Sequence, residues 1–289
     1  MTTAEWKQQG TFRTIAGYEL FTITSKEAGT PLLLLHGFPT ASWDWHKIWP
    51  ELSKTFRLLS FDFLGFGFSE KPWPHAYQIV EQADLCEALL RQLGVRHYHL
   101  LAHDYGNSVA QELMARQSAD HSGPRLKTVC FLNGGLFPEA HHARPVQQLL
   151  AGPLGPLAVS FMSKGILARS FRRIFGPQTQ PSSKEIDQFW QLIRHHRGKR
   201  CIPGLMQYME ERRLQRERWV PPLLEGLIPV RLINGPEDPV SGRHLAEHFL
   251  NLTPTADIVY IDGVGHYPQM EAPAEVVHHV LDFHHIAQP

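Results

Sequence analysis

The sequence predicts an α/β fold: a mostly parallel sheet covered by helices on both faces, with a helical cap inserted over one edge. Three observations predict it. Short apolar runs alternate with helix-period segments through the first part of the chain. The alternation stops near residue 137 and resumes near residue 228. A strand, a sharp turn of small residues and a helix surround Asp104. We therefore predict a core of residues 1–136 and 228–289 and a cap of residues 137–227.

The expected elements alternate in the order that such a sheet requires. The apolar run Pro31–Leu35 predicts a strand buried on both faces. Leu85, Leu89 and Leu93 follow the helix period, and Gly94 ends that helix. Strands are expected over residues 11–15 and 19–23 (a hairpin), 31–35, 56–61, 97–101, 126–132, 231–234 and 257–261. Helices are expected over residues 43–52, 79–93 and 109–114, around 245, and over 274–283.

Size and composition indicate an ordinary globular protein. The 289 residues suffice for one large α/β unit with an insertion, and the 28 Lys and Arg balance the 28 Asp and Glu, which argues against a nucleic-acid partner. The first residues lack an apolar leader, no apolar stretch predicts a membrane span, and the three Cys form no disulfide or metal pattern. We expect a cytoplasmic monomer or homodimer, without cofactor or metal, acting on a small apolar organic molecule and water.

The segment Ala102-His103-Asp104-Tyr105-Gly106 carries the strongest chemical signal. A strand precedes it and a helix-period segment follows, so the chain turns sharply at Asp104. The small residues Ala102 and Gly106 let the backbone close up, and the strained turn lifts the Asp104 side chain clear of the sheet. We therefore predict that Asp104 is a nucleophile.

Other strand ends supply the partners of Asp104. Asp238 and His266 each follow a predicted strand, which gives the chain order nucleophile, acid, histidine. The strand Pro31–Leu35 leads to Phe38, whose backbone N–H can join that of Tyr105 to bind a developing oxyanion. Because all these residues follow strands at their carboxyl ends, we expect them to converge on one site.

An aspartate nucleophile narrows the reaction. Attack of Asp on a saturated carbon forms an ester, which water activated by histidine can hydrolyse, whereas the ether formed by a serine would not turn over. We expect Asp104 to form a covalent alkyl-enzyme ester, His266 to activate the water, and Asp238 to orient and stabilise the imidazole. Epoxides and carbon–halogen bonds suit such a displacement.

These motifs resemble those of the α/β-hydrolase superfamily over nearly the whole chain. The Asp nucleophile is similar to that of epoxide hydrolases, haloalkane dehalogenases and haloacetate dehalogenases, and the resemblance is most specific to the mesoderm-specific transcript proteins of vertebrates. It rests on His36–Thr40, Leu59–Ser69, His103–Gly106, Asn133–Gly135, Phe175–Pro177, Gly235–Val240 and His266–Gln269. The resemblance implies the α/β-hydrolase fold and a hydrolase that needs no cofactor.

Further residues distinguish the possible substrates. Tyr208 lies in a segment that resembles the one in which epoxide hydrolases carry a ring-opening tyrosine. Tyr105 stands where haloalkane dehalogenases usually have a Trp and haloacetate dehalogenases an Arg, so opening of epoxides to diols is the leading prediction. A second ring-opening tyrosine has no counterpart, and the cap histidines are candidates to replace it: His141, His142, His195 and His196. We also expect substrate contacts from His36, Trp43, His103, Phe137 and Trp190.

Several alternatives stay open. The chain could instead be a haloalkane or haloacid dehalogenase, an ester or lactone hydrolase, or a catalytically silent ligand-binding relative. The acid could lie near Asn133 or Glu139, and Tyr208 could be a packing residue. The basic run Arg212–Arg218 predicts a solvated helix face. The apolar segment Leu157–Phe175 is expected to line the pocket rather than to contact a membrane surface.

Overall fold

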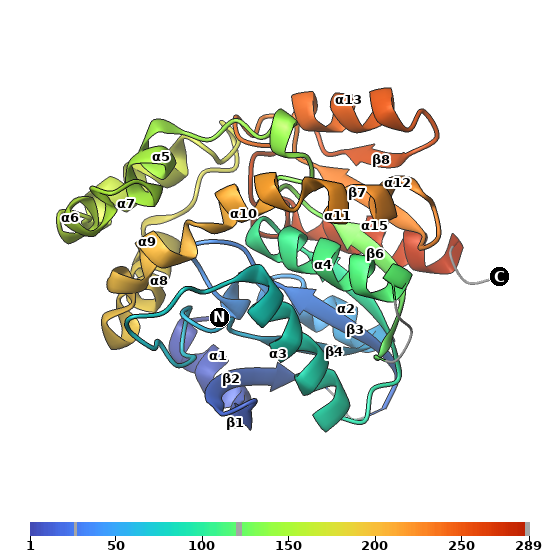
Figure 1. Ribbon diagram of the computed structural model, residues 1–289, viewed down its shortest axis with the longest axis horizontal. Coiled ribbons are helices and arrows are strands. Elements are labelled where there is room, and N and C mark those ends of the chain that lie inside the picture. The colour runs from blue at the N-terminus through green and yellow to red at the C-terminus, as the bar shows by residue number, and fades with distance from the viewer. Residues whose placement is uncertain (26–27, 120–122, 287–289) are drawn as a thin grey trace.

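The computed structural model describes residues 1–25, 28–119 and 123–286 and confirms the predicted α/β architecture (Figure 1). Its eight described strands form a sheet in the order β1-β2-β4-β3-β5-β6-β7-β8. The pairs β1–β2 and β2–β4 are antiparallel, and the other neighbouring pairs are parallel. The strands are β1 (Thr11–Ile15), β2 (Tyr18–Thr24), β3 (Thr30–Leu35), β4 (Phe56–Phe61), β5 (His97–Ala102), β6 (Arg125–Phe131), β7 (Val230–Asn234) and β8 (Asp257–Tyr260).

Helices cover both faces of the sheet. Helices α3 and α4 pack together in front of the sheet in Figure 1, and α2 and α15 contact each other behind it. The helices outside the insertion are α1 (Thr3–Gln9), η1 (Ser42–Trp45), α2 (Trp49–Thr55), α3 (Ile79–Gln92), α4 (Tyr105–Ala119), α13 (Arg243–Leu252), α14 (Pro268–Glu271) and α15 (Pro273–Ile286).

The chain between β6 and β7 forms helices joined by short connections from residue 138 to residue 224, with no described strand, and we call this insertion the cap. Its helices α5, α6 and α7 lie at one end of the molecule, away from the sheet (Figure 1). The division into domains at residues 136/137 and 227/228 remains a prediction. The cap elements are η2 (Pro138–Ala140), α5 (Pro145–Ala151), α6 (Gly155–Ser160), α7 (Lys164–Arg172), α8 (Ser183–Arg194), η3 (His195–Cys201), α9 (Ile202–Leu205), α10 (Tyr208–Leu214), α11 (Arg216–Trp219) and α12 (Pro221–Leu224).

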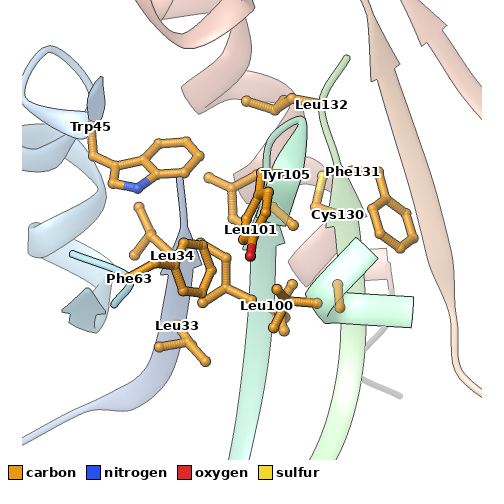
Figure 2. Close-up of a cluster of buried hydrophobic side chains, with 14 of the residues drawn as sticks. Leu33, Leu34, Trp45, Phe63, Leu100, Leu101, Tyr105, Cys130, Phe131 and Leu132 are labelled. Atoms are coloured by element: carbon orange, nitrogen blue, oxygen red, sulfur yellow. The ribbon is translucent and has the colours of Figure 1, made fainter. Parts of the chain in front are cut away.

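The hydrophobic core lies on both faces of the central strands. Leu33 and Leu34 of β3 and Leu100 and Leu101 of β5 are at most 1 % exposed and belong to the same cluster of buried side chains as Tyr105 (Figure 2). Burying each such leucine contributes roughly 1.5–3 kcal/mol relative to an exposed one. Because both faces are covered, these strands read as continuous apolar runs rather than as alternating ones. The core thereby holds β3 and β5 in a fixed register, with Leu35 opposite Ala102.

The site is placed by the order of the strands. Strand β3 lies between β4 and β5, so the chain leaves β3 toward one side and β5 toward the other. The loops after two such strands diverge and leave a crevice at the carboxyl edge of the sheet, where ligands bind in open α/β folds. Phe38 follows β3 and Asp104 follows β5, so both residues lie at this crevice.

Two local predictions are wrong. The helix expected over residues 43–52 is divided into η1 and α2, which begins at Trp49. Pro50 explains the division, because proline lacks the backbone N–H that a helix interior needs and is tolerated in the first turn. The second error concerns Arg212, which is only 2 % exposed rather than solvated. The other arginines of that run do pair with acids, Arg213 with Glu210, Arg216 with Glu139 and Arg218 with Glu112.

Candidate active site

Asp104 occupies a sharp turn between β5 and α4. Its φ angle is 47°, in the left-handed region that costs a residue with a side chain about 1–3 kcal/mol. The N–H of Asp104 donates to the carbonyl of Asn133 at 2.9 Å, and the N–H of Gly106 donates to that of His103 at 2.8 Å. A Cβ at Gly106 would overlap the backbone of Leu35 in β3. These contacts hold the strained turn, as the predicted elbow requires.

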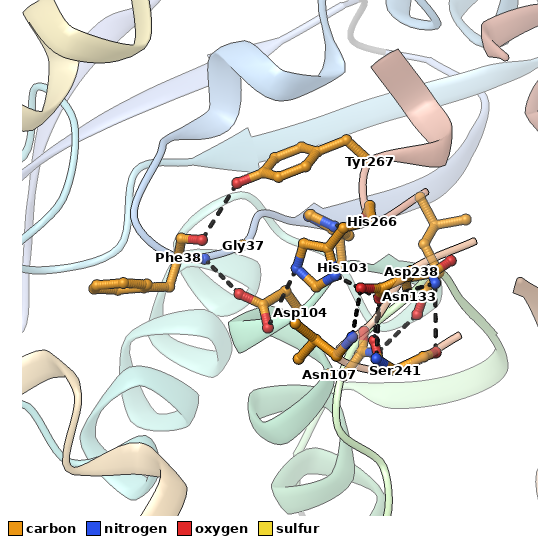
Figure 3. Close-up of polar contacts among 12 residues, drawn as sticks. Gly37, Phe38, His103, Asp104, Asn107, Asn133, Asp238, Ser241, His266 and Tyr267 are labelled. Atoms are coloured by element: carbon orange, nitrogen blue, oxygen red, sulfur yellow. Dashed lines mark hydrogen bonds and ion pairs between the residues drawn. The ribbon is translucent and has the colours of Figure 1, made fainter. Parts of the chain in front are cut away.

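The Asp104 carboxylate is buried but has two polar neighbours (Figure 3). Its Oδ2 accepts a hydrogen bond from the backbone N–H of Phe38 at 3.0 Å. Its Oδ1 lies 3.9 Å from Nε2 of His266. Burial raises the pKa of Asp104, while the positive charges of His266 and Arg212 and the Phe38 N–H act in the opposite direction. The carboxylate is therefore little solvated, and the neighbouring cations favour its ionised form.

Asp238 and His266 form the closest ion pair of the site. Nδ1 of His266 lies 2.7 Å from Oδ2 of Asp238. The same oxygen accepts hydrogen bonds from the Ser241 hydroxyl at 2.7 Å and from the Asn133 amide at 3.1 Å, and Oδ1 accepts from the Val240 N–H at 2.8 Å. Asn133 therefore supports the acid at Asp238.

The alternative acid Glu139 is occupied elsewhere. Its carboxylate pairs with Arg216 at 2.7 Å on the exposed side of the cap. Of the acid positions considered from the sequence, only Asp238 contacts the His266 ring in the described part of the chain.

The charge of His266 stabilises the ionised forms of Asp238 and Asp104, and their charges stabilise the ionised form of His266. Burial lowers the pKa of His266, but the charge and hydrogen bond of Asp238 and the charge of Asp104 outweigh it and raise the pKa to about 9. Burial acts to raise the pKa of Asp238, and the His266 charge together with the hydrogen-bond donors lowers it instead. At neutral pH the imidazole is therefore protonated and lies between two carboxylates.

The loop that carries His266 is fixed on three sides. Its N–H donates to the carbonyl of Ile174 in the cap at 2.7 Å. Its carbonyl accepts a hydrogen bond from Nε2 of His103 at 2.7 Å, and burial lowers the pKa of His103 so that this ring is neutral. The Glu271 carboxylate accepts the Tyr267 N–H at 2.8 Å. The His103 side chain thus binds the backbone of the loop that carries His266. The cap is joined directly to the same loop through Ile174.

A cavity of about 380 Å³ opens over Asp104 and His266. This volume lies in the range of small-molecule sites. As expected, the apolar segment 157–175 contributes to its wall. The largest apolar side chains of the lining are Phe38, Leu149, Leu150, Phe161, Met162, Ile166, Leu167, Phe171 and Ile174.

Tyr208 is buried next to the site. Its ring lies 5.1 Å from that of Tyr105 and 6.4 Å from that of Phe38, measured between ring centres. Burial and the Asp104 charge raise the pKa of Tyr208. Its hydroxyl makes no hydrogen bond of ordinary geometry with the described residues. Tyr208 therefore packs against the aromatic wall with its hydroxyl beside Arg212, and it is not among the described residues that line the cavity.

The five residues expected to contact substrate, His36, Trp43, His103, Phe137 and Trp190, are not among the described residues that line the cavity. Nε2 of His36 accepts the Phe63 N–H at 3.0 Å beneath the crevice. Trp43 is stacked on His46, and Phe137 packs against Phe249. The Trp190 ring packs against the cationic groups of Arg194 and Lys199.

Arg212 is a buried cation beside the nucleophile that the sequence interpretation missed. Its Nε and Nη2 donate to the Ser108 hydroxyl at 3.1 and 2.9 Å, while Nη1 has no hydrogen-bond partner of ordinary geometry among the described residues. Its guanidinium carbon lies 5.0 Å from the centre of the Tyr208 ring. A Cβ at Gly135 would overlap Nη1, so this glycine leaves room for the guanidinium. In the sequence, the Gly134-Gly135 pair after Asn133 was the one feature that could have indicated space for a large side chain here.

Residues 1–25, 28–119 and 123–286 contain neither a cluster of metal ligands nor a membrane-spanning helix. No three His, Cys, Asp or Glu side chains of these residues are grouped so that they could hold a metal ion. No described helix combines the length and apolar character that a membrane span requires.

Known proteins are similar to this chain in sequence or in fold. The sequence is 42% identical to the mesoderm-specific transcript homolog protein of Bos taurus over 289 residues, which covers 96% of this chain and 86% of the relative. Among solved structures, the haloalkane dehalogenase DbeA from Bradyrhizobium elkani USDA94 superimposes with a TM-score of 0.80 at 21% identity, covering 96% of this chain and 98% of the other. The epoxide hydrolase CorEH superimposes with a TM-score of 0.74 at 20% identity, covering 95% and 97%.

The sequence profile described as the alpha/beta hydrolase family matches residues 32–279. That range runs from strand β3 to helix α15 and includes the turn at Asp104, the cap and the loops of Asp238 and His266. The chain belongs to the alpha/beta hydrolase family.

Proposed function

We propose that the chain is a cofactor-independent epoxide hydrolase with Asp104 as nucleophile, His266 as base and Asp238 as the acid of the triad. The observation that carries the proposal is the position of the Asp104 carboxylate. One oxygen accepts the Phe38 N–H and the other faces His266, at the base of a mainly apolar cavity. An apolar cavity over a carboxylate suits attack on a substrate whose reacting carbon lies in a neutral, weakly polar part of the molecule.

The proposed reaction has two steps. In the first, an Asp104 oxygen bonds to a ring carbon of the epoxide, the carbon–oxygen bond breaks, and the freed oxygen takes up a proton. In the second, His266 removes a proton from water, and the water oxygen attacks the carbonyl carbon of the Asp104 ester. The N–H groups of Phe38 and Tyr105 hold the oxyanion until the ester breaks and the diol leaves.

The charge network supplies the change in His266 that the second step needs. Before the reaction the imidazole is protonated, because Asp238 and Asp104 together outweigh its burial. Ester formation removes the Asp104 charge, so the pKa of His266 falls and the ring can lose its proton. Asp238 retains its charge and stabilises the imidazolium that forms again when water is deprotonated.

Tyr208 is the proposed proton donor for the opening ring. Its hydroxyl is buried beside the Arg212 side chain and feels the charge of Asp104, so it lies close to the reacting carboxylate. The neighbouring Arg212 charge favours the phenolate that remains after proton transfer. This cation supports the proposal that a single tyrosine suffices here, where epoxide hydrolases normally supply two.

The lining of the cavity favours epoxide opening over dehalogenation. Haloalkane dehalogenases usually bind halide with a Trp directly after the nucleophile and an Asn or Trp elsewhere. No Trp or Asn is among the described residues that line this cavity, whose side-chain N–H donors besides His266 are Arg144 and Gln147 of the cap. Tyr105, directly after the nucleophile, packs its ring against Phe63 and Phe66.

A panel of neutral epoxides, chloro- and bromoalkanes and aryl esters tests the assignment, with diol, halide and carboxylate release measured separately. We expect diol formation to dominate and to fall about 10²- to 10⁴-fold in Tyr208→Phe. Tyr18→Phe is the matched control, because Tyr18 pairs with Glu81 at the far edge of the sheet. Halide or ester turnover without diol would reject epoxide hydrolysis, and binding without any turnover would identify a silent relative.

A further inference from the structure

One further charged side chain lines the cavity. Besides Asp104 and His266, the only charged residue of the described lining is Arg144, which precedes α5. Its Nη1 donates to the carbonyl of Ser170 in α7 at 3.2 Å. No Asp or Glu of the described residues forms an ion pair with Arg144 within 4.0 Å. The guanidinium therefore has unused donors beside the cavity.

The chain around Arg144 supplies no counter-charge. Residues 140–183 contain no Asp or Glu, although they include Lys164, Arg169, Arg172 and Arg173. Burial and the Arg173 charge lower the pKa of Arg144, and the more distant Asp238 charge acts in the opposite direction without outweighing them. Lys164 pairs with Asp187 of α8 at 2.6 Å, and Arg144 is the one cation of this segment among the described residues that line the cavity.

The remaining wall is apolar and open at one side. Leu149, Phe161 and Ile166 line the cavity and are also 47%, 71% and 47% exposed. The cavity therefore reaches the surface between α5, α6 and α7, at the end of the molecule that projects from the sheet in Figure 1. An apolar chain can occupy it and gains about 0.8 kcal/mol for each CH₂ group that it buries.

We infer that the substrate is an amphiphilic acid: an apolar chain with one carboxylate, which Arg144 binds while Asp104 attacks the epoxide carbon. A planar guanidinium with free N–H groups matches a carboxylate through two parallel hydrogen bonds. A single cation balances the single charge of a carboxylate. The inference rests on the proposed function for its reaction, but the binding of the acid does not depend on turnover.

A pair of substrates that differ only in charge tests the inference. We would measure kcat/KM for 10,11-epoxyundecanoic acid and for its methyl ester at low ionic strength. The wild-type protein should prefer the acid, and Arg144→Gln should lower kcat/KM for the acid about 10- to 100-fold while leaving the ester within about twofold. Arg144→Lys should retain part of the preference, because it keeps the charge and loses the paired geometry.

Arg169→Gln is the matched control. Arg169 lies on α7, is exposed and does not line the cavity, so its variant removes the same charge without removing a contact. Its acid-to-ester ratio should stay near the wild-type value. An equal loss for both substrates in Arg144→Gln, or an unchanged ratio, would overturn the inference.

A binding measurement separates the inference from the proposed reaction. Calorimetric titration of the wild-type protein with dodecanoate and with 1-dodecanol should show tighter binding of the acid, and Arg144→Gln should abolish the difference. If dodecanoate binds in this way but no epoxide is opened, the proposed function fails and the inferred ligand class stands. If the alcohol binds as tightly as the acid, the inferred class fails even when epoxides are opened.

Discussion

Nε2 of His266 lies 3.9 Å from Oδ1 of Asp104. This separation is beyond hydrogen-bond distance, although the other nitrogen of the same ring is bonded to Asp238 at 2.7 Å. The ring is therefore held by the acid rather than by the nucleophile. In the proposed reaction, this geometry leaves Nε2 available to a water molecule that approaches the ester at Asp104.

Replacing His266 should separate the two proposed steps. His266→Gln keeps Asp104 as nucleophile but removes the base, so the alkyl-enzyme ester should accumulate and turnover should stop after about one equivalent. Intact-mass measurement should find the protein heavier by the mass of the substrate, with the addition on the Asp104 peptide. His97→Gln, at an exposed position that begins β5, should turn over normally. A His266→Gln protein that never becomes heavier would contradict the assigned roles.

The protonation of His266 should stabilise the fold over a defined pH range. Because the folded pKa is raised to about 9, this contribution is fully present below the unfolded value near 6.5 and is lost as the pH rises through 9. It amounts to a few kcal/mol, since one pKa unit corresponds to about 1.4 kcal/mol. Asp104→Asn should lower the pKa in an NMR titration of the ring and weaken the loss of thermal stability between pH 6.5 and 9.5. An unchanged titration would show that the two side chains are not coupled.

Replacing Asp238 should reduce kcat more than replacing any single side chain that donates a hydrogen bond to it. Asp238→Asn removes the charge that stabilises the imidazolium and should reduce kcat by roughly 10³- to 10⁴-fold. Ser241→Ala removes one donor while the Val240 N–H and the Asn133 amide remain, so its kcat should fall about tenfold or less. Steady-state kinetics on one epoxide checks both variants. Equal losses in the two would mean that the carboxylate acts only through the local hydrogen bonds.

The Arg212 charge should determine the lowest pH at which Asp104 is alkylated in the first step. Its charge opposes the rise that burial causes in the pKa of Asp104, so Arg212→Gln should raise that pKa further. The acidic limb of the single-turnover alkylation rate should therefore move to higher pH, and Arg212→Lys should restore part of the shift. Arg213→Gln is the control, because Arg213 is exposed and pairs with Glu210. An acidic limb that stays in place in Arg212→Gln would exclude this electrostatic role.

The main strands and the candidate triad could be predicted because local sequence determines them. Strand β3 is an apolar run, and Asp104, Asp238 and His266 each follow a strand whose carboxyl end lies at the same edge of the sheet. The proposed roles of these residues still await experiment.

The surroundings of the cavity could not be predicted in the same way. The burial of Arg212 depends on Ser108, about a hundred residues earlier, and on the space at Gly135. Its own helix α10 has only seven residues and too many charges to show an apolar face. Arg144 lies beside Ser170 only because α5 and α7 flank the same cavity. Contacts between cap helices distant in sequence leave no periodic signal.

The central claim is that the Asp104 carboxylate bonds to substrate carbon and is released by water. A single turnover in ¹⁸O-water, with enzyme in excess over the epoxide, tests it directly through the masses of the Asp104 peptide and the diol. We predict one ¹⁸O atom in the Asp104 carboxylate and none in the diol, because water attacks the ester carbonyl. Label in the diol with an unlabelled Asp104 peptide would contradict the account.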